Sequence, residues 1–437
     1  MRTHNKISLL ATTGLAALLL GPLAHAQTVT SSNTTATQTP GEILNDHGIQ
    51  LTLNYTGEAA ANPSGGIRQG SAYAGQIYLG ADFDLAHIAG WQGATLHVAL
   101  TQRHGRNLAA DDIGNNTSVQ EVYGTQNAHL AVFTIEQKLL NNQLDITAGR
   151  TVANIAFLNS PLYCDFQSNS ACGNPTFIFK DSNFTYFPAS AWGGDARYFF
   201  NPTTYFHAGL YEVSPLDKET NTNGFNFSGN RDTGVITPDE IGYTTDQALY
   251  ALGGWYDTGA YTDPLNDTAG QPALLAGQPY ARHHDRSGLF ARFTQNVNST
   301  GLAVFGVFMT RLSGQENEND YYELGAVQTG TFAGRDADTV GLMVNDQDFS
   351  GAFLNNIRIA RESAGGTGNI PHREIMMELN YSAQLTPAVR VMPNLQYIVN
   401  PDQSGEPYRT KNIPDAFVVG VKFTVDLAKL AGLSPPA

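Results

Sequence analysis

The chain has 437 residues, and its 24 lysines and arginines against 39 aspartates and glutamates give a formal net charge of −15. This acidic balance argues against nucleic acid as a partner, because nucleic-acid binding depends on basic side chains that neutralise phosphates. Beyond the N-terminal region, no stretch approaches the roughly 18 continuous apolar residues of a membrane-spanning helix, so only strands could cross a membrane.

The N-terminus has the three parts of a secretory signal peptide. Two basic residues open it, residues 7–20 are mostly apolar, and residues 24–26 read Ala-His-Ala, a small-x-small cleavage site. We therefore expect residues 1–26 to be removed on export. The Ser/Thr-rich stretch that follows is predicted to be a flexible N-terminal leader, residues 27–47, with a helical turn near its end.

From residue 49 onward, large apolar side chains alternate with small or polar ones. The alternation is clear in residues 49–56, 73–83, 94–103, 289–294, 374–381, 389–397 and 416–427. Successive side chains of a β-strand point to opposite faces, so each segment has one apolar and one wet face. In the last segment Phe417, Val419, Val421, Phe423, Val425 and Leu427 form the apolar face, and the length suits a tilted strand that crosses a bilayer.

Weaker segments of the same kind bring the total to about fifteen. They are residues 129–138, 144–149, 192–200, 204–212, 248–256, 302–310, 322–328 and 339–345. Single-chain bacterial outer-membrane barrels have an even number of strands, so we predict sixteen, with eighteen as the alternative.

The predicted links alternate in length. Residues 141–143, 201–203 and 386–388 are short links, whereas residues 103–122, 151–191, 214–247 and 257–287 are long and polar. Short turns at one end and long loops at the other are typical of an outer-membrane barrel. Charged residues in mid-strand also favour a polar lumen over a sandwich core, where they would be buried unpaired.

We therefore predict an all-β, transmembrane antiparallel β-barrel over residues 48–427, with long extracellular loops folded into the lumen, followed by a tail at residues 428–437. A periplasmic all-β protein is the alternative. The two cysteines, Cys164 and Cys172, are close in sequence in an exported chain, which favours a disulfide that closes a small loop; two free thiols are the weaker alternative.

Several motifs resemble one known family, the carbohydrate-selective porins of the OprB type. They include GWQGA at residues 90–94, the two-cysteine loop, FPASAWG at residues 187–193 and PNLQYIVNP at residues 393–401. The resemblance covers most of the mature chain. It implies an outer-membrane barrel through which monosaccharides diffuse passively, with loops that narrow the lumen and arginines at the narrowest point.

Four arginines are candidates for that constriction. Arg103 and Arg197 share the wet parity of their strands, and Arg68 lies in the Gly-rich stretch GGIRQG. Arg150 falls on the alternate positions that carry the apolar side chains and would face lipid. We therefore expect it to lie past the strand end, where the chain turns into the two-cysteine loop. An arginine supplies planar donors for adjacent sugar hydroxyls. For each of the four, a solvated loop charge or a lipopolysaccharide contact is the alternative.

Aromatic and acidic candidates accompany them. Trp192 and Tyr163 are near the expected constriction and would stack on a sugar ring, although girdle or loop packing explains them equally well. Glu374, together with Glu378 on the same wet face, is expected to pair with lumen arginines.

We find no motif for catalysis, a cofactor or a metal, and His283-His284-Asp285 lies in a long polar loop. The expected partners are a monosaccharide, outer-membrane lipid and lipopolysaccharide, and the barrel-assembly machinery, with the chain a monomer or a trimer. A porin for polyols or organic acids is the first alternative. A barrel-scaffold enzyme or adhesin of the outer membrane is the second.

Overall fold

The computed structural model describes residues 38–172, 175–218, 220–297 and 301–434. The predicted signal peptide and the first part of the predicted leader lie outside these residues. Within them, the leader ends in helix α1 (Pro40–Asp46), which Thr39 and Glu42 cap reciprocally at its N-terminus. No helix in these ranges is long and apolar enough to span a membrane.

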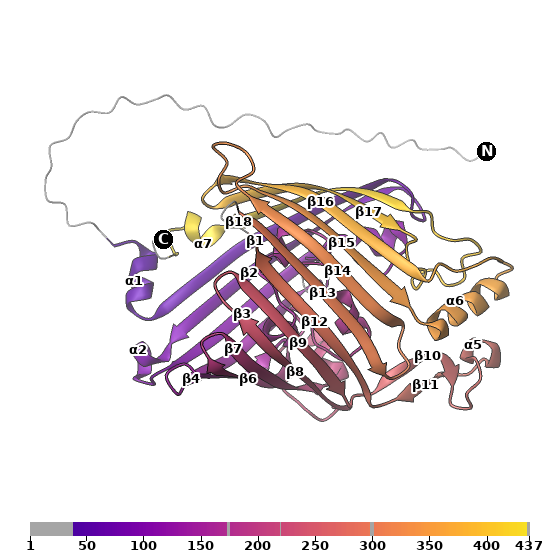
Figure 1. Cartoon of the computed structure of the whole chain (residues 1–437), viewed down its shortest axis with the longest axis horizontal. Helices are drawn as coiled ribbons and strands as arrows, with labels where there is room; N and C mark the ends of the chain where they lie inside the picture. The colour runs from indigo at the N-terminus through magenta and orange to yellow at the C-terminus, as the bar shows by residue number, and fades with distance from the viewer. Residues whose placement is uncertain (1–37, 173–174, 219, 298–300, 435–437) are drawn as a thin grey trace, which may run out of the picture. The chain divides into compact units, whose positions relative to one another are not determined.

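Strands dominate the described residues and close into a single antiparallel barrel (Figure 1). In chain order, the sixteen barrel strands are β1 (Ile49–Ser64), β2 (Gly70–Asp84), β3 (Ala94–Gly105), β4 (Ala128–Leu139), β5 (Leu144–Thr151), β6 (Ala191–Asn201), β7 (Thr204–Val213), β8 (Gly234–Thr244), β9 (Ala248–Asp257), β12 (Arg286–Asn296), β13 (Leu302–Ser313), β14 (Glu318–Thr329), β15 (Thr339–Phe349), β16 (Arg373–Thr386), β17 (Val389–Val399) and β18 (Ala416–Asp426). Each strand pairs with its neighbours along this order, and β1 pairs with β18 to close the barrel. The prediction of sixteen strands is confirmed.

The remaining elements are short. They are the β10–β11 hairpin (Tyr261–Asp267 and Tyr280–His283), the helices α2 (Leu85–Ala89), α3 (Ala153–Ala156), α4 (Thr176–Lys180), α5 (Ala273–Ala276), α6 (Gly351–Ser363) and α7 (Leu427–Leu430), a π-helix at Ala109–Ile113, and 3₁₀ turns at Tyr163–Asp165, Pro215–Lys218 and Thr220–Thr222. Helix α6 contacts β10, and both lie past the ends of the barrel strands, at one end of the barrel (Figure 1).

The alternation predicted the faces of the strands correctly. In β18, Val419 and Val421 are exposed on the outer face, whereas Val418 and Lys422 are buried inside. A lipid-facing surface requires an apolar side chain at every outward position, and this demand produces the period of two. One boundary differs, because Leu427 begins helix α7 and does not belong to the strand.

Strand β8 lies inside residues 214–247, which we predicted to be a loop, and that prediction is wrong. Its inward positions include Pro238, Glu240 and Gly242, residue types that strands otherwise avoid. A side chain at Gly242 would begin 2.2 Å from the ring of Tyr205, so this position must stay small. The inward positions of β8 therefore hold residue types that are unusual in strands, and for this reason the sequence did not show the alternation clearly.

Connections of different length lie at the two ends of the barrel, as predicted. Residues 140–143 and 202–203 are short turns at one end. At the other end, residues 106–127, 152–190 and 258–285 form long loops. We call residues 152–190 the inner loop, because its hydrophobic side chains pack against the inward faces of barrel strands.

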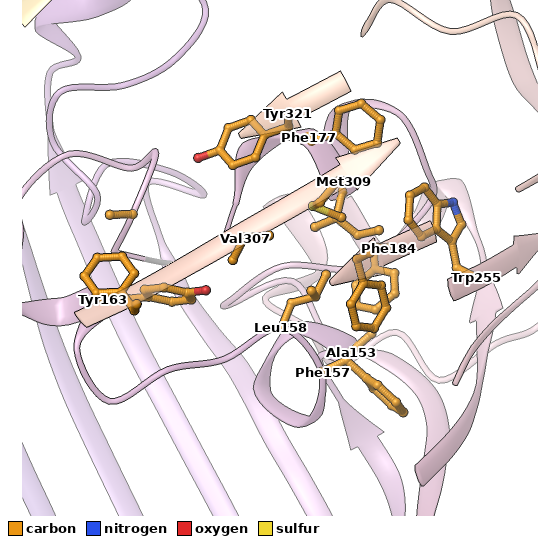
Figure 2. Close-up of a cluster of buried hydrophobic side chains, with 14 of the residues drawn as sticks. Ala153, Phe157, Leu158, Tyr163, Phe177, Phe184, Trp255, Val307, Met309 and Tyr321 are labelled. Carbon is orange, nitrogen blue, oxygen red and sulfur yellow. The ribbon is translucent and has the colours of Figure 1, made fainter. Parts of the chain in front are cut away.

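The inner loop is attached to the wall by a cluster of buried apolar side chains (Figure 2). From the loop, the cluster includes Phe157, Leu158, Tyr163, Phe177 and Phe184; from strands β9, β13 and β14 it includes Trp255, Val307, Met309 and Tyr321. Removing this much apolar surface from water stabilises the folded-in loop. The polar lumen that we predicted is therefore limited to the part of the wall that the loop leaves uncovered.

Candidate functional site

A buried carboxylate on the barrel wall holds the middle of the inner loop. Glu378 on β16 accepts hydrogen bonds from the backbone N–H groups of Gln167, at 2.9 and 3.1 Å, and Ser168, at 2.8 Å. Its side chain is almost fully buried. Charge-assisted bonds of this kind are strong in a site that excludes water.

Glu374, four residues earlier, plays the same part for other loops. It accepts hydrogen bonds from the backbone N–H of Asp402 at 2.7 Å and from the side-chain amides of Asn115 and Gln347 at 3.1 and 3.0 Å. The expected pairing of Glu374 and Glu378 with lumen arginines is therefore wrong. The sequence showed that these carboxylates face inward, but their partners are loop residues far away in the chain and, for Glu374, also Gln347 on the neighbouring strand β15.

Lys422 of β18 supports the two-cysteine segment from the wall. Its ammonium donates to the carbonyl oxygens of Phe166 at 2.8 Å and Cys164 at 3.3 Å. The sulfur atoms of Cys164 and Cys172 are 2.9 Å apart and belong to two thiols in this structure, so the disulfide stays a prediction.

Arg103 of β3 faces the lumen, as its parity predicted, and three neighbours fix its guanidinium. Nε donates to Gln76 Oε1 at 2.6 Å, and Nη2 donates to Glu121 Oε1 at 3.2 Å. The ring of Phe187, from the inner loop, lies 5.5 Å from the guanidinium carbon, which is a cation–π distance. Nη1 lies 3.4 Å from the position that a Cβ on Gly124 would take.

Neighbours of this arginine line two cavities, although Arg103 itself lines neither of them. We call the first the outer cavity; it has a volume of about 410 Å³, and Gly124 and Tyr186 line it. We call the second the inner cavity; it has a volume of about 340 Å³, and Tyr78 lines it. The ring of Tyr78 lies 6.1 Å from that of Phe187, which is the ring that contacts Arg103.

The inner cavity is lined by strands β2 to β6 and by Ile155 and Ala156 of the inner loop, and it carries charges of both signs. His97 lies between two carboxylates, with Nδ1 2.6 Å from Asp82 Oδ1 and Nε2 3.0 Å from Glu136 Oε2. Asp145 and Asp195 also line this cavity. We did not single out these groups from the sequence; the wet parity of Asp82 and His97 was visible, but their contact follows only from the register of β2 on β3.

Arg197 of β6 belongs to the inner cavity, as its wet parity suggested. Its guanidinium carbon lies 5.2 Å from the ring centroid of Tyr205, and its Nη2 lies 3.4 Å from His207 Nδ1. The other ring nitrogen of His207 lies 2.8 Å from Asp195 Oδ1. Phe157 of the inner loop stacks on this imidazole with a centroid separation of 4.0 Å. Arg197 therefore lines the inner cavity together with Asp195.

Arg150 and Trp192 do not line the lumen. They are opposite each other in the register of β5 and β6, and Trp192 shares its face with Tyr198 and Phe200, which are exposed on the outside. Arg150 is within β5, not past its end as we expected. Both residues are therefore removed from the set of constriction candidates.

A loop that folds over the outside of the barrel explains how Arg150 avoids lipid. Its guanidinium donates to Glu212 at 2.8 Å, to the Ser190 carbonyl at 2.5 Å and to Asp217 at 3.4 Å, and the ring of Phe227 lies 5.9 Å away. Burial and the neighbouring Glu212 raise the pKa of Asp217 to about 7, against the lowering effect of Arg150.

Arg68 and Tyr163 have positions that suit structure more than transport. Arg68 lies in the turn between β1 and β2 with an exposed side chain, and its Nε donates to Asp112 at 2.5 Å. Tyr163 is buried in the apolar cluster, with its ring 5.4 Å from that of Phe305. Neither residue lines the outer or the inner cavity.

A closed sixteen-strand antiparallel barrel, with short turns at one end and long loops that fold into its lumen, has the architecture of an outer-membrane porin. The model of the carbohydrate-selective porin family, OprB, matches residues 68–427, and the chain belongs to this family. It is accordingly a protein of the bacterial outer membrane.

Similar proteins agree with this assignment. Porin B of Pseudomonas aeruginosa is 30% identical over 93% of this chain and 95% of its own length. A putative porin, QuiX, of Acinetobacter baylyi is 26% identical over 88% of this chain and 90% of its own length. The high-pH structure of Pseudomonas putida OprB is 29% identical, covers 90% of this chain and all of the other, and superposes with a TM-score of 0.80.

Proposed function

We propose that the chain is a passive channel for neutral, glucose-like monosaccharides and that Arg103 is the selective contact in its lumen. The observation that carries this proposal is the guanidinium of Arg103, which Gln76, Glu121 and Phe187 fix beside Gly124 of the outer cavity. The apolar cluster of the inner loop covers strands β9, β13 and β14, so a solute that moves along the charged wall of β2 to β6 meets Arg103 and then Arg197.

The chemistry of the contact suits a sugar. A guanidinium offers several N–H donors in one plane. In this proposal Nη1 of Arg103, which lies next to Gly124, donates to a sugar hydroxyl. Phe187 and Tyr78 supply rings for the apolar face of a pyranose. One such contact gives weak binding, and a dissociation constant near 1 mM corresponds to only about −4 kcal/mol, so the sugar also leaves readily.

Organic acids fit the inner cavity less well than neutral sugars. Asp82, Asp145 and Asp195 line it, and His97 is already placed between two carboxylates. After passing Arg103, an anion would be repelled by the negative charge of these carboxylates. We expect the reversal potential in a salt gradient to indicate weak cation preference, and a clear anion preference would favour the organic-acid alternative.

The test is glucose block of single-channel current in a planar bilayer. Arg103→Ala should abolish saturable block, and Arg103→Lys should weaken it, because lysine keeps the charge but lacks the planar fork. Arg358→Ala on the surface of α6 is the matched control and should leave block unchanged. Unchanged block in both Arg103 variants would refute the role of this residue, and absence of block in the unmodified protein would refute sugar selectivity.

The family and fold describe a channel, and we propose further that transport involves no catalytic step or cofactor. Contacts with lipopolysaccharide and with the barrel-assembly machinery stay predictions. The oligomeric state, monomer or trimer, also stays open.

A further inference from the structure

The outer cavity has the composition of a carbohydrate-binding site. It lies among the long loops and is lined by amide and hydroxyl side chains together with aromatic rings: Asn107, Asn116, Ser118, Tyr123, Asn169, Phe179, Tyr186, Asn317, Phe349, Phe353 and Ser404. Its volume of about 410 Å³ is within the range of small-molecule sites. The residues come from separate loops, so the folded barrel brings them together.

Backbone hydrogen bonds hold three of the amides in place. The N–H of Asn116 donates to Asp402 Oδ2 at 2.8 Å, and the N–H of Asn169 donates to the Ser118 carbonyl at 3.0 Å. The carbonyl of Asn317 accepts from the N–H of Ser350 at 2.8 Å. With their main chains fixed in this way, the three side-chain amides line the cavity, and each offers both a donor and an acceptor to a hydroxyl group.

Aromatic rings complete the wall. Phe179 and Tyr186 are in contact with centroids 4.9 Å apart, and Phe349 and Phe353 are in contact with centroids 5.3 Å apart. The phenylalanines and Tyr186 line the same cavity as the amides. Rings beside planar amides provide both contacts that a pyranose needs, an apolar face and an ordered hydroxyl edge.

Three charged residues also line the cavity, Lys180, Glu318 and Asp402. Lys180 Nζ lies 3.2 Å from Glu318 Oε1 and also donates to Thr117 and Gln347. The second carboxylate oxygen of Glu318, Oε2, is buried and has no hydrogen-bond partner among the described residues.

We propose that the outer cavity is a capture site for a neutral pyranose sugar, separate from the Arg103 contact and occupied before it by sugar that arrives from the long-loop side. This inference rests on the proposed function, because Gly124 borders both the cavity and Arg103. The capture site would raise the local concentration of sugar next to Arg103.

The test separates the two sides of the channel. Glucose is added to one chamber at a time, with protein inserted from a single chamber, and association rates are taken from current block. Asn169→Ala and Asn317→Ala, which change two different loops, should each lower the association rate from the long-loop side by about threefold to tenfold, the effect of losing one hydrogen bond. The rate from the short-turn side should not change.

Asn266→Ala, in the β10–β11 hairpin outside the cavity, is the matched control. Each variant must show the conductance of the unmodified protein, which verifies that the barrel and inner loop are intact. A long-loop-side association rate in Asn169→Ala and Asn317→Ala that equals the rate of the unmodified protein, together with loss of block in Arg103→Ala, would overturn the capture site alone. Absence of glucose block in the unmodified protein would overturn the proposed function as well.

Discussion

Replacement of Glu378 tests whether the inner loop narrows the lumen. In Glu378→Ala, the buried N–H groups of Gln167 and Ser168 lose their acceptor. An unpaired buried donor costs about 1–3 kcal/mol, so two cost about 2–6 kcal/mol. Even about 2 kcal/mol changes the ratio of seated to released loop by about thirtyfold.

We therefore expect higher single-channel conductance and weaker glucose block in Glu378→Ala, because the middle of the loop leaves the wall. Glu378→Gln retains one carbonyl acceptor and should show a smaller change. Glu362→Ala, on the exposed side of α6, is the control and should behave like the unmodified protein. The reasoning is refuted if Glu378→Ala folds into a heat-modifiable barrel with unchanged conductance and unchanged block.

Two further predictions concern stability. Because the folded pKa of Asp217, about 7, is above the unfolded value of about 3.9, this carboxyl stabilises the closed loop 214–233 fully below pH 4, and the contribution is lost as pH rises through 7. Hydrogen exchange in this loop should therefore accelerate from pH 5 to 8 and become less pH-dependent in Asp217→Asn; an identical pH profile in the variant would contradict this. Phe157→Ala removes the ring stacked on His207 and should cost about 3–5 kcal/mol, so that the thermal unfolding midpoint falls clearly; an unchanged midpoint would show that the contact contributes little.

The outer surface of the barrel could be predicted from the sequence, because lipid imposes the same local requirement at every outward position. Val419 and Val421 follow this rule without reference to any loop. Arg103 was placed correctly for the same reason, since its parity alone directs it inward. Such predictions need only neighbouring residues, and the register between strands does not affect them.

Arg150 shows where this reasoning fails. Its place in the alternation directs it to the outer face, which is correct. Because an arginine that faces lipid is unfavourable, we placed Arg150 past the strand end, which is wrong. The structure resolves it through Asp217 and Phe227, which follow Arg150 by more than sixty residues in the chain. No local pattern indicates that a loop returns over the outside of the barrel, so the ion cluster could not be predicted from sequence.

The inner wall explains why selectivity depends on few strands. Inward-facing positions of a porin are expected to carry polar side chains. Three of them are instead apolar or aromatic, because the inner loop covers them: Phe305, Met309 and Tyr321. An apolar cluster holds a loop in a water-filled channel without using polar groups that water or sugar could displace. The wall from β2 to β6 keeps its charged side chains, Arg103 and Arg197 among them, beside the few apolar loop residues that reach it, such as Ile155 and Phe187. A substitution in the apolar cluster should therefore alter the width of the path, whereas a substitution on β2 to β6 should alter which solute the path accepts.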